Sequence, residues 1–326
     1  MPRIRFPRHG SLMYWPRKRA KSMVARVRTW SSSKEPKLLG FGGYKVGMTH
    51  AIVTDNRPNS ITKGEGIQCP ITIIECPPLK VAGLVLYTKD AYGLHCVGCI
   101  LSSNLDKDLS RRLPFPKAAP KPVDQLKPED YAEVRVLVHT QPKLTSSLNK
   151  KKPEMFELAL GGSVKEKLDA ARALLGKEVN AKDVLAEGTQ FDAHSVTTGR
   201  GTQGPVKRFG VRIRHHKSEK TKRGPGNLGP WHGRKMWRVA HAGKMGFHTR
   251  TEINKLVIKI DADPAKVNAK GGFVRYGVVR NPYLLVKGSI PGPEKRFIKF
   301  TKAVRPDLRI PAQPPAIQYL SISSKQ

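Results

Sequence analysis

The chain has 326 residues, of which 38% are hydrophobic, so it is long enough for two compact parts and apolar enough for a core. It carries 60 Lys and Arg against 25 Asp and Glu, and folding does not require this net charge of +35, because like charges repel in a compact state. The composition excludes wholesale disorder and indicates a polyanionic partner, with nucleic acid as the first candidate.

Several other classes of protein are excluded by the same inspection. No apolar stretch approaches the roughly 20 residues of a membrane helix, and no apolar segment of a secretory signal follows the basic N-terminus. Four cysteines are too few for a disulfide scaffold in a chain of this length. We therefore expect an intracellular protein that has no membrane partner.

The positive charge is concentrated in two segments. Residues 1–40 hold 11 basic side chains and one acid, and residues 200–250 hold 14 basic side chains and one acid. These 91 residues contribute +23, whereas the other 235 contribute only +12. Both segments lack the periodicity of an independent core, and 214–235 is dense in Gly and Pro. We predict that both are irregular arms that become ordered against a charged partner.

The remaining residues read mostly as strands. An apolar run punctuated by glycines begins this part, and alternating or β-branched runs then predict strands. The apolar run lies at 38–53, and the predicted strands lie at 71–75, 81–89, 94–101, 134–139, 194–198, 255–260, 273–279, 284–287 and 296–302. The polar, Pro-rich stretch 102–130 reads as a boundary between parts.

Two helices are predicted between the strands. Ser163 and Glu166 form a capping-box pattern, and Gly176 is placed to end a helix over 163–175. A shorter helix is predicted from about Ala181 to Glu187. We predict an α+β, mainly β protein: a β-barrel with an α/β insertion and long irregular basic extensions. The predicted parts are the arm 1–37, barrel 38–101, insertion 102–190, return to the barrel 191–210, extension loop 211–250, and barrel with C-terminal tail 251–326.

Short motifs give little support to an enzyme. The sequence Gly199-Arg-Gly-Thr-Gln-Gly204 matches the dinucleotide pattern, but Pro205 follows it where an amphipathic helix is required. Five of the ten histidines lie in the second cationic segment, where Glu219 is the only carboxylate, so a metal-dependent nuclease lacks its oxygen ligands. We predict no catalytic residue and no cofactor.

The cysteines do not predict a metal site. Only Cys96 and Cys99 have ligand spacing, whereas Cys69 and Cys76 are too far apart to form a second knuckle. Buried or half-buried strand cysteines are the preferred interpretation, with a structural Zn²⁺ site as the alternative.

Aromatic residues are interleaved with the charge. Trp231 differs from the others, because its neighbours Gly229, Pro230, His232 and Gly233 offer no apolar surface for local packing. A large ring at the tip of a basic loop is suited to stacking on an unpaired base or to insertion into folded RNA.

At these residues the chain resembles the ribosomal protein L3 (uL3) family of the archaeal and eukaryotic type, over essentially its whole length. The resemblance rests on RHGSLMYWPRKRAKS at 8–22, LLGFGGYKVGMTH at 38–50, RPNSITKGEGIQCPITIIECPPLKVAG at 57–83, TTGRGTQGPVKRFG at 197–210 and the 40-residue segment 216–255. The chain departs from the usual family pattern at Gly233, His241, Lys244 and Phe247.

The resemblance implies a cytoplasmic, structural protein of the large ribosomal subunit that binds rRNA and acts early in assembly. It implies a barrel of the type found in translation factors and two extensions that reach toward the peptidyl transferase centre, with Pro230, Trp231 and His232 at the tip. It also implies neighbouring ribosomal proteins as partners and no small-molecule substrate. The residues that we expect to bind rRNA are Arg3, Arg5, Arg8, Trp15, Arg17, Lys18, Arg19, Arg200, Lys207, Arg208, Arg212, Arg214, His215, His216, Lys217, Lys220, Lys222, Arg223, Trp231, His232, Arg234, Lys235, Arg238, Lys244, His248 and Arg250.

One alternative stays open on composition alone. A DNA or chromatin binder without sequence preference could also use such a charge. Irregular loops with an aromatic tip favour folded RNA, because readers of duplex DNA generally present a helix or a ribbon.

Overall fold

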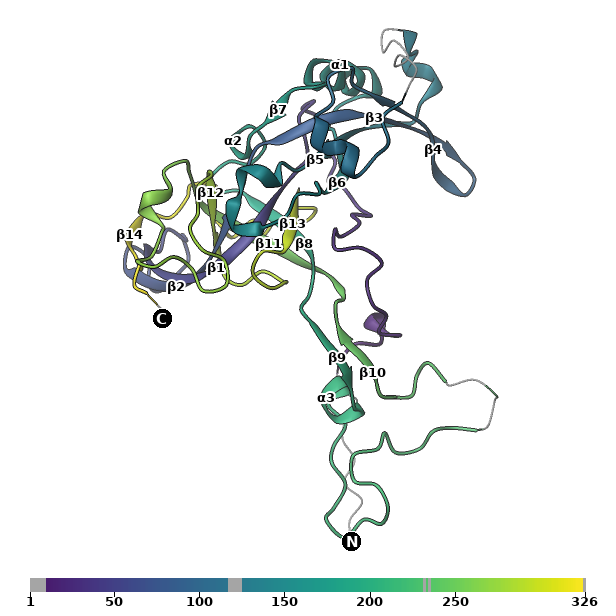
Figure 1. Ribbon diagram of the computed structural model, residues 1–326. Helices are drawn as coiled ribbons and strands as arrows, with labels where there is room; N and C mark the ends of the chain where they lie inside the picture. Colours follow the sequence, from purple (N-terminus) through teal and green to yellow (C-terminus); the bar gives the residue numbers. More distant parts are fainter. Residues whose placement is uncertain (1–9, 117–124, 231–232, 234–235, 325–326) are drawn as a thin grey trace. The chain divides into compact units, whose positions relative to one another are not determined.

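The computed structural model describes residues 10–116, 125–230, 233 and 236–324, and these are mainly β with a few short helices (Figure 1). The α+β, mainly β class is therefore confirmed. The chain divides into two units. We call residues 1–23 with 196–250 the cationic unit, and residues 24–195 with 251–326 the β unit.

The larger sheet of the β unit has the order β13-β8-β11-β12-β2-β1-β14, and the pairs of β1 with β2, β13 and β14, of β12 with β2 and β11, and of β13 with β8 are antiparallel. Strand β1 is long enough to pair with β13 through its first five residues, with β2 through most of its length, and with β14 near its end. Because β13 pairs with both β8 and β1, the order returns on itself. Its strands are β1 (Gly40–Thr54), β2 (Gly66–Glu75), β8 (Gln190–Val196), β11 (Thr249–Asp261), β12 (Tyr283–Lys287), β13 (Phe297–Lys302) and β14 (Ile317–Leu320).

A five-stranded sheet lies between β2 and β8 in the sequence. Its order is β4-β3-β5-β6, and the short β7 pairs with β3. Its strands are β3 (Leu79–Asp90), β4 (Gly93–Leu101), β5 (Glu133–His139), β6 (Met155–Ala159) and β7 (Glu178–Val179). Short 3-10 helices are η1 (Leu12–Tyr14), η2 (Lys107–Arg111), η4 (Pro128–Asp130), η5 (Pro142–Leu144), η6 (Ser146–Leu148) and η7 (Pro264–Lys266).

The helix α1 (Val164–Leu174) forms as its sequence predicts. The Ser163 amide donates to the Glu166 carboxylate at 2.7 Å and the Glu166 amide donates to Ser163 Oγ at 3.4 Å, so the capping box is present. The helix buries Leu168 and Ala171 and lies against β5. The second helix, α2 (Ala181–Val184), is shorter than predicted, and its chain leaves the helix at Leu185.

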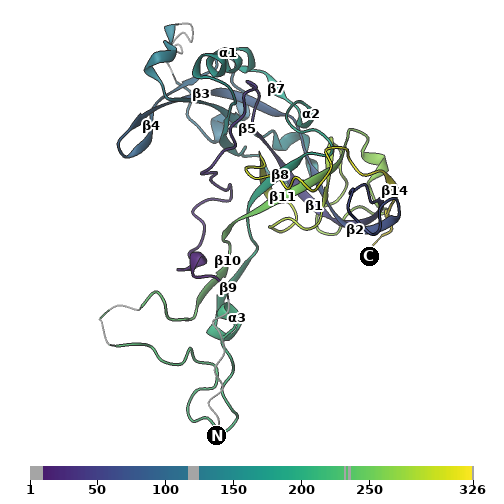
Figure 2. The same ribbon diagram turned by 180° about the vertical axis from the view of Figure 1, so that it is seen from behind.

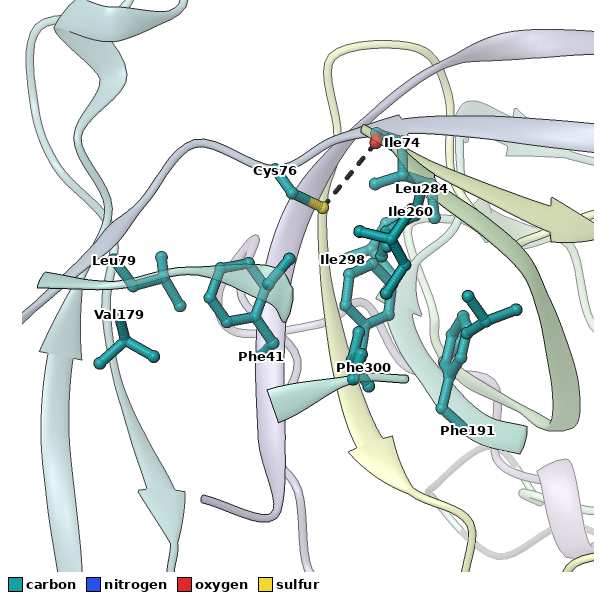
Figure 3. Packing of buried hydrophobic residues seen from close by; sticks show 14 of the residues in the cluster. Phe41, Ile74, Cys76, Leu79, Val179, Phe191, Ile260, Leu284, Ile298 and Phe300 are labelled. Atoms are coloured by element: carbon teal, nitrogen blue, oxygen red, sulfur yellow. Dashed lines mark hydrogen bonds between the residues drawn. The ribbon is translucent and has the colours of Figure 1, made fainter. Parts of the chain in front are cut away.

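The main apolar core of the β unit is continuous between its sheets. Phe41 and Phe300 are fully buried on β1 and β13, and Phe191 meets Phe300 edge-on with ring centroids 4.8 Å apart (Figure 3). In the same view the thiol of Cys76 points toward the backbone carbonyl of Ile74. The cysteine prediction is half right, because Cys69 and Cys76 are buried whereas Cys96 and Cys99 are exposed, and all four thiols are free.

The prediction of a strand at 273–279 is wrong. These residues form a tight turn in which Phe273 and Gly277 exchange two backbone hydrogen bonds. Gly277 has φ +102°, a conformation that favours glycine, and the alternating apolar pattern belongs to this packed turn. Tyr276 is buried there and donates its hydroxyl to the buried carboxylate of Glu75.

Candidate nucleic-acid interface

The cationic unit contains 21 Lys and Arg residues and a single carboxylate, Glu219, so its net charge is +20. Its ordered centre is a strand pair, β9 (Gly199–Gln203) with β10 (Gly243–Gly246), and a helix, α3 (Pro205–Phe209). Figures 1 and 2 both show α3 directly after β9, with β10 beside β9.

The presence of helix α3 corrects the expectation that Pro205 prevents a helix after the glycine motif. Pro205 does not prevent a helix; it occupies the first turn, where no backbone N–H is required, and the chain leaves the helix at Gly210 with φ +69°. The helix has only five residues; Gly199 and Gly201 lie within β9, and Gly204 is the N-cap of α3. A dinucleotide-binding motif needs a long amphipathic helix at this point, so the structure gives no support to a dinucleotide site at 199–204.

Arg208 on α3 connects three segments of the cationic unit. Its Nε donates to the carbonyl of Lys244 at 3.0 Å, Nη1 to that of His241 at 2.9 Å, and Nη2 to that of Arg17 at 3.0 Å. The planar fork of a guanidinium allows these separate bonds, which an ammonium group cannot reproduce. Arg208 thus connects the N-terminal arm to α3, to β10 and to the residues just before β10. We call this region of contact between the arm and the β9–β10 strand pair the junction.

His248 makes a second connection to the arm. The amide of Gly246 donates to His248 Nε2 at 3.1 Å, so Nδ1 carries the proton and donates to the carbonyl of Lys18 at 2.7 Å. The amide of Ala20 donates to the carbonyl of Phe247 at 2.8 Å. Burial lowers the pKa of His248; the bond to Lys18 raises it, and three nearby arginines lower it further. The imidazole therefore acts here in its neutral form.

Aromatic rings and the arginines packed on them complete this junction. The rings of Trp15 and Phe209 have centroids 4.3 Å apart, and the guanidinium of Arg17 lies 4.3 Å from the Phe209 ring centroid. Tyr14 is covered by the guanidinium of Arg250 at 4.6 Å. Burial lowers the pKa of Arg17, and the charges of Arg208 and Arg250 lower it further. The junction gathers several cations in a unit whose sequence contains one carboxylate, that of Glu219.

The structure places the predicted residues in two groups. Trp15, Arg17, Lys18, Arg208 and His248 take part in the junction, mostly through bonds within the protein. The other described residues are exposed or partly exposed. Arg19 lies in the arm and Arg250 on β11; along β9, α3, β10 and the irregular segment between α3 and β10 lie Arg200, Lys207, Arg212, Arg214, His215, His216, Lys217, Lys220, Lys222, Arg223, Pro230, Arg238 and Lys244. Arg3, Arg5, Arg8, Trp231, His232, Arg234 and Lys235 lie outside the described residues.

The irregular segment 211–242 exposes most of its described cations. The amide of Arg214 donates to the carbonyl of Lys222 at 3.0 Å, which closes a small loop. Residues 211–214 alternate between apolar and basic side chains but form no strand. Trp237 is half exposed beneath the guanidinium of Arg238, at 5.0 Å.

The association of the arm with the extension was missed by sequence reasoning. Tyr14, Phe209 and Phe247 are the residues that it left out, and each carries an arginine over its ring. The signal in the sequence was the presence of aromatic residues in both cationic segments. That signal does not predict which ring packs against which arginine. No group of three or more metal-ligating side chains occurs among the residues described, and no described helix is long and apolar enough to cross a membrane.

Comparison with known proteins places the chain in a family. The model of the family described as Ribosomal protein L3 matches residues 1–326. The chain belongs to the ribosomal protein L3 family. It is 46% identical over 336 residues to the large ribosomal subunit protein uL3 of Methanobrevibacter smithii, covering 100% of this chain and 99% of that protein. It is also similar to proteins of the same name from Archaeoglobus fulgidus, at 46% identity over 98% of both chains, and from Methanosphaera stadtmanae, at 47% over 100% and 99%.

The archaeal relatives agree with the family resemblance of the sequence motifs. Those relatives are named as ribosomal proteins rather than as enzymes, so a structural role in the ribosomal family replaces the catalytic readings of the glycine and histidine motifs.

Proposed function

We propose that this chain is a structural component of the large ribosomal subunit that binds rRNA through its cationic unit. The observation that carries the proposal is a net charge of +20 on a unit that has one carboxylate. Arginines, exposed rings and irregular backbone suit the phosphates and unpaired bases of folded RNA. The archaeal relatives are named as proteins of the large ribosomal subunit, which supports the large subunit as the place of binding.

The residues of the cationic unit fall into two groups with different tasks, one that holds the arm and one that is exposed to a partner. Arg208 and His248 hold the arm on the β9–β10 base, whereas exposed cations such as Lys207, Lys217 and Arg223 are free of that task and face solvent. We assign the phosphate contacts chiefly to the exposed group. We further propose that the returning strand order of the larger sheet is a barrel that docks by its surface, and that the tip near Pro230 reaches toward the peptidyl transferase centre.

We also propose that the chain binds early in subunit assembly and works in the cytoplasm. No observation favours the DNA or chromatin alternative: the helix α3 has only five residues, and the described strand pair of the cationic unit, β9 with β10, is only four to five residues long. The deciding experiment is sedimentation of the endogenous protein with large subunits through a high-salt wash. Retention in the subunit fraction is expected, and release into the free-protein fraction would contradict the proposal.

A further inference from the structure

The β unit contains a groove that rRNA binding by the cationic unit does not use. Its volume is about 820 Å³, and it lies between the end of β1, the loop 55–61, the start of β2 and the segment 307–315. Its floor includes Val53, Cys69 and Leu256, all buried. A cavity of this size with an apolar floor can take up several side chains.

One wall of the groove is a loop held by an Asp-x-Arg pair. The Asp55 carboxylate accepts from Arg57 Nε at 2.9 Å, Arg57 Nη2 at 2.8 Å and Thr62 Oγ1 at 2.9 Å. These hydrogen bonds, Arg57 first, hold the pKa of Asp55 well below its usual range. Because both hydrogen bonds of the Arg57 guanidinium to a carboxylate go to Asp55, this wall is nearly neutral.

The facing wall contains a second Asp-x-Arg pair. The Asp307 carboxylate accepts from Arg309 Nε and Nη2, both at 3.0 Å, and these bonds lower the pKa of Asp307. Gln190 on β8 bonds to both the amide and the carbonyl of Asp307, at 2.9 and 2.8 Å. Asn56 donates from Nδ2 to the carbonyl of Gln313 at 2.7 Å, which joins the two walls.

Each wall carries a fully exposed aliphatic side chain at its rim. The exposed fraction is 103% for Ile61 and 93% for Leu308. Both side chains belong to loops that contain the Asp-x-Arg pairs, so they are exposed from hydrogen-bonded loops and not from a free chain end. Leaving two such side chains in water is unfavourable, and a paired rim of this kind marks a contact surface. A small molecule bound in the groove would leave the rim in water, so the rim favours a macromolecule.

The charge of the groove selects the kind of macromolecule. Its ionisable lining residues are two carboxylates, two guanidinium groups already paired with them, and Lys287, for a net charge of +1 on a chain of +35. Phosphate recognition generally uses several cations that are not already paired with carboxylates, whereas both arginines of this groove are paired and Lys287 is its single lysine. A protein interface instead has an apolar centre with few net charges and neutralised arginines near it.

We propose that this groove docks a segment of a neighbouring protein of the large subunit, which inserts a large apolar or aromatic side chain between Ile61 and Leu308. The proposal rests on the proposed place of the chain in the large subunit. It does not depend on which cations contact rRNA. The walls are already fixed by internal hydrogen bonds, so docking costs little ordering entropy.

The test is photo-cross-linking within assembled subunits. A photoreactive phenylalanine derivative replaces Asn59, an exposed wall residue, in the full-length chain, and salt-washed large subunits are irradiated. We expect an adduct with one ribosomal protein, at an apolar segment. Its yield, normalised to the chain present in the subunit fraction, should fall at least about tenfold in an Ile61→Glu, Leu308→Glu variant. Tyr92→Glu is the matched control, since Tyr92 is 94% exposed and lies outside the groove.

The outcomes separate the two proposals. Failure of the unsubstituted chain to sediment with the subunit contradicts the proposed function. Sedimentation without an adduct, an adduct with rRNA, or a protein adduct that survives the double substitution overturns the docking groove alone. A protein adduct that the double variant loses and the Tyr92→Glu variant keeps supports the groove.

Discussion

At the scale of single residues, His248 shows how a cationic segment can use a histidine without charging it. Its Nε2 accepts from the Gly246 amide and its Nδ1 donates to the Lys18 carbonyl. Protonation would remove the acceptor and add a charge beside Arg17 and Arg250, and the lowered pKa of His248 reflects burial first and these arginines after it. The neutral ring is therefore part of the connection between arm and extension.

This role predicts that the arm loosens in acid. A histidine with a lowered folded pKa contributes stability that is present above its ordinary pKa of about 6.5 and is lost as the pH falls through the folded value. We expect the Ala20 amide, which donates to Phe247, to exchange faster at about pH 5 than at about pH 7 after correction for intrinsic rates. Hydrogen exchange measures this directly.

The matched variant for this test is His248→Gln, which keeps one donor and one acceptor but does not titrate. It should protect Ala20 equally at both pH values, and His248→Ala should protect it at neither. Equal protection in the wild-type chain at both pH values would show that the imidazole does not hold the arm.

Lys299 is a residue whose charge the β unit disfavours. It is buried on β13 over the ring of Phe156, and burial lowers its pKa to about 8; Glu157 raises the pKa and Arg135 lowers it. Between that value and the ordinary lysine pKa the unfolded chain binds more protons than the folded one, so the free energy of unfolding rises with pH.

We expect the wild-type chain to gain roughly 2 kcal/mol of unfolding free energy, relative to Lys299→Met, between about pH 7.5 and pH 9.5. The measurement is urea unfolding of both chains at the two pH values. Groups that titrate in both chains cancel in the difference. A constant difference between wild type and variant would mean that Lys299 keeps a normal pKa in the fold.

At the scale of elements, local signals predicted most of the β unit and little of the cationic unit. The capping box at Ser163 and Glu166 predicted α1 to within a residue at each end, because both halves of the signal are local. The turn at 273–279 was mistaken for a strand, because its apolar residues are anchored by a distant partner, Glu75. Arg208 was predicted as a phosphate ligand, and no local pattern reveals that its nitrogens bond to three carbonyls from separate segments.

The irregular segment between α3 and β10 should be separable from the elements that carry it. Its hydrogen bonds to the junction are made near its ends, as at His241, so we expect deletion of 215–235 with a short Gly-Ser linker to leave β9, β10 and the β unit folded. Incorporation into large subunits or translation should nevertheless be impaired. Thermal unfolding and sedimentation of the same variant test the two halves of this prediction.

A length-matched variant separates charge from chain length in that test. Changing Lys217, Lys220, Lys222 and Arg223 to Gln keeps the segment and removes four of its cations. It should sediment less with large subunits at raised salt, with an unchanged melting temperature. Loss of the fold of the β unit on deletion of 215–235 would instead show that the segment is part of the core.

At the scale of the whole molecule, charge and apolar core are divided between the two units. The cationic unit carries +20 and the β unit +15, and the large apolar cluster lies almost entirely in the β unit. Folding stability and RNA affinity should accordingly respond to different substitutions. Neutralising exposed cations of the cationic unit should change affinity and its salt dependence more than it changes the melting temperature.

Salt dependence is the sharpest measure of that division. Each phosphate neutralised on single-stranded RNA contributes a slope of about −0.7 to the plot of log affinity against log salt. Residues 1–22 carry seven cations, so their deletion should make the slope for a large-subunit rRNA fragment shallower by at most about 5 units. A duplex DNA of equal length, measured at the same salt concentrations, is the control. Weaker binding to the duplex is expected, because irregular backbone and exposed rings fit folded RNA; equal affinity would favour a binder of nucleic acid in general.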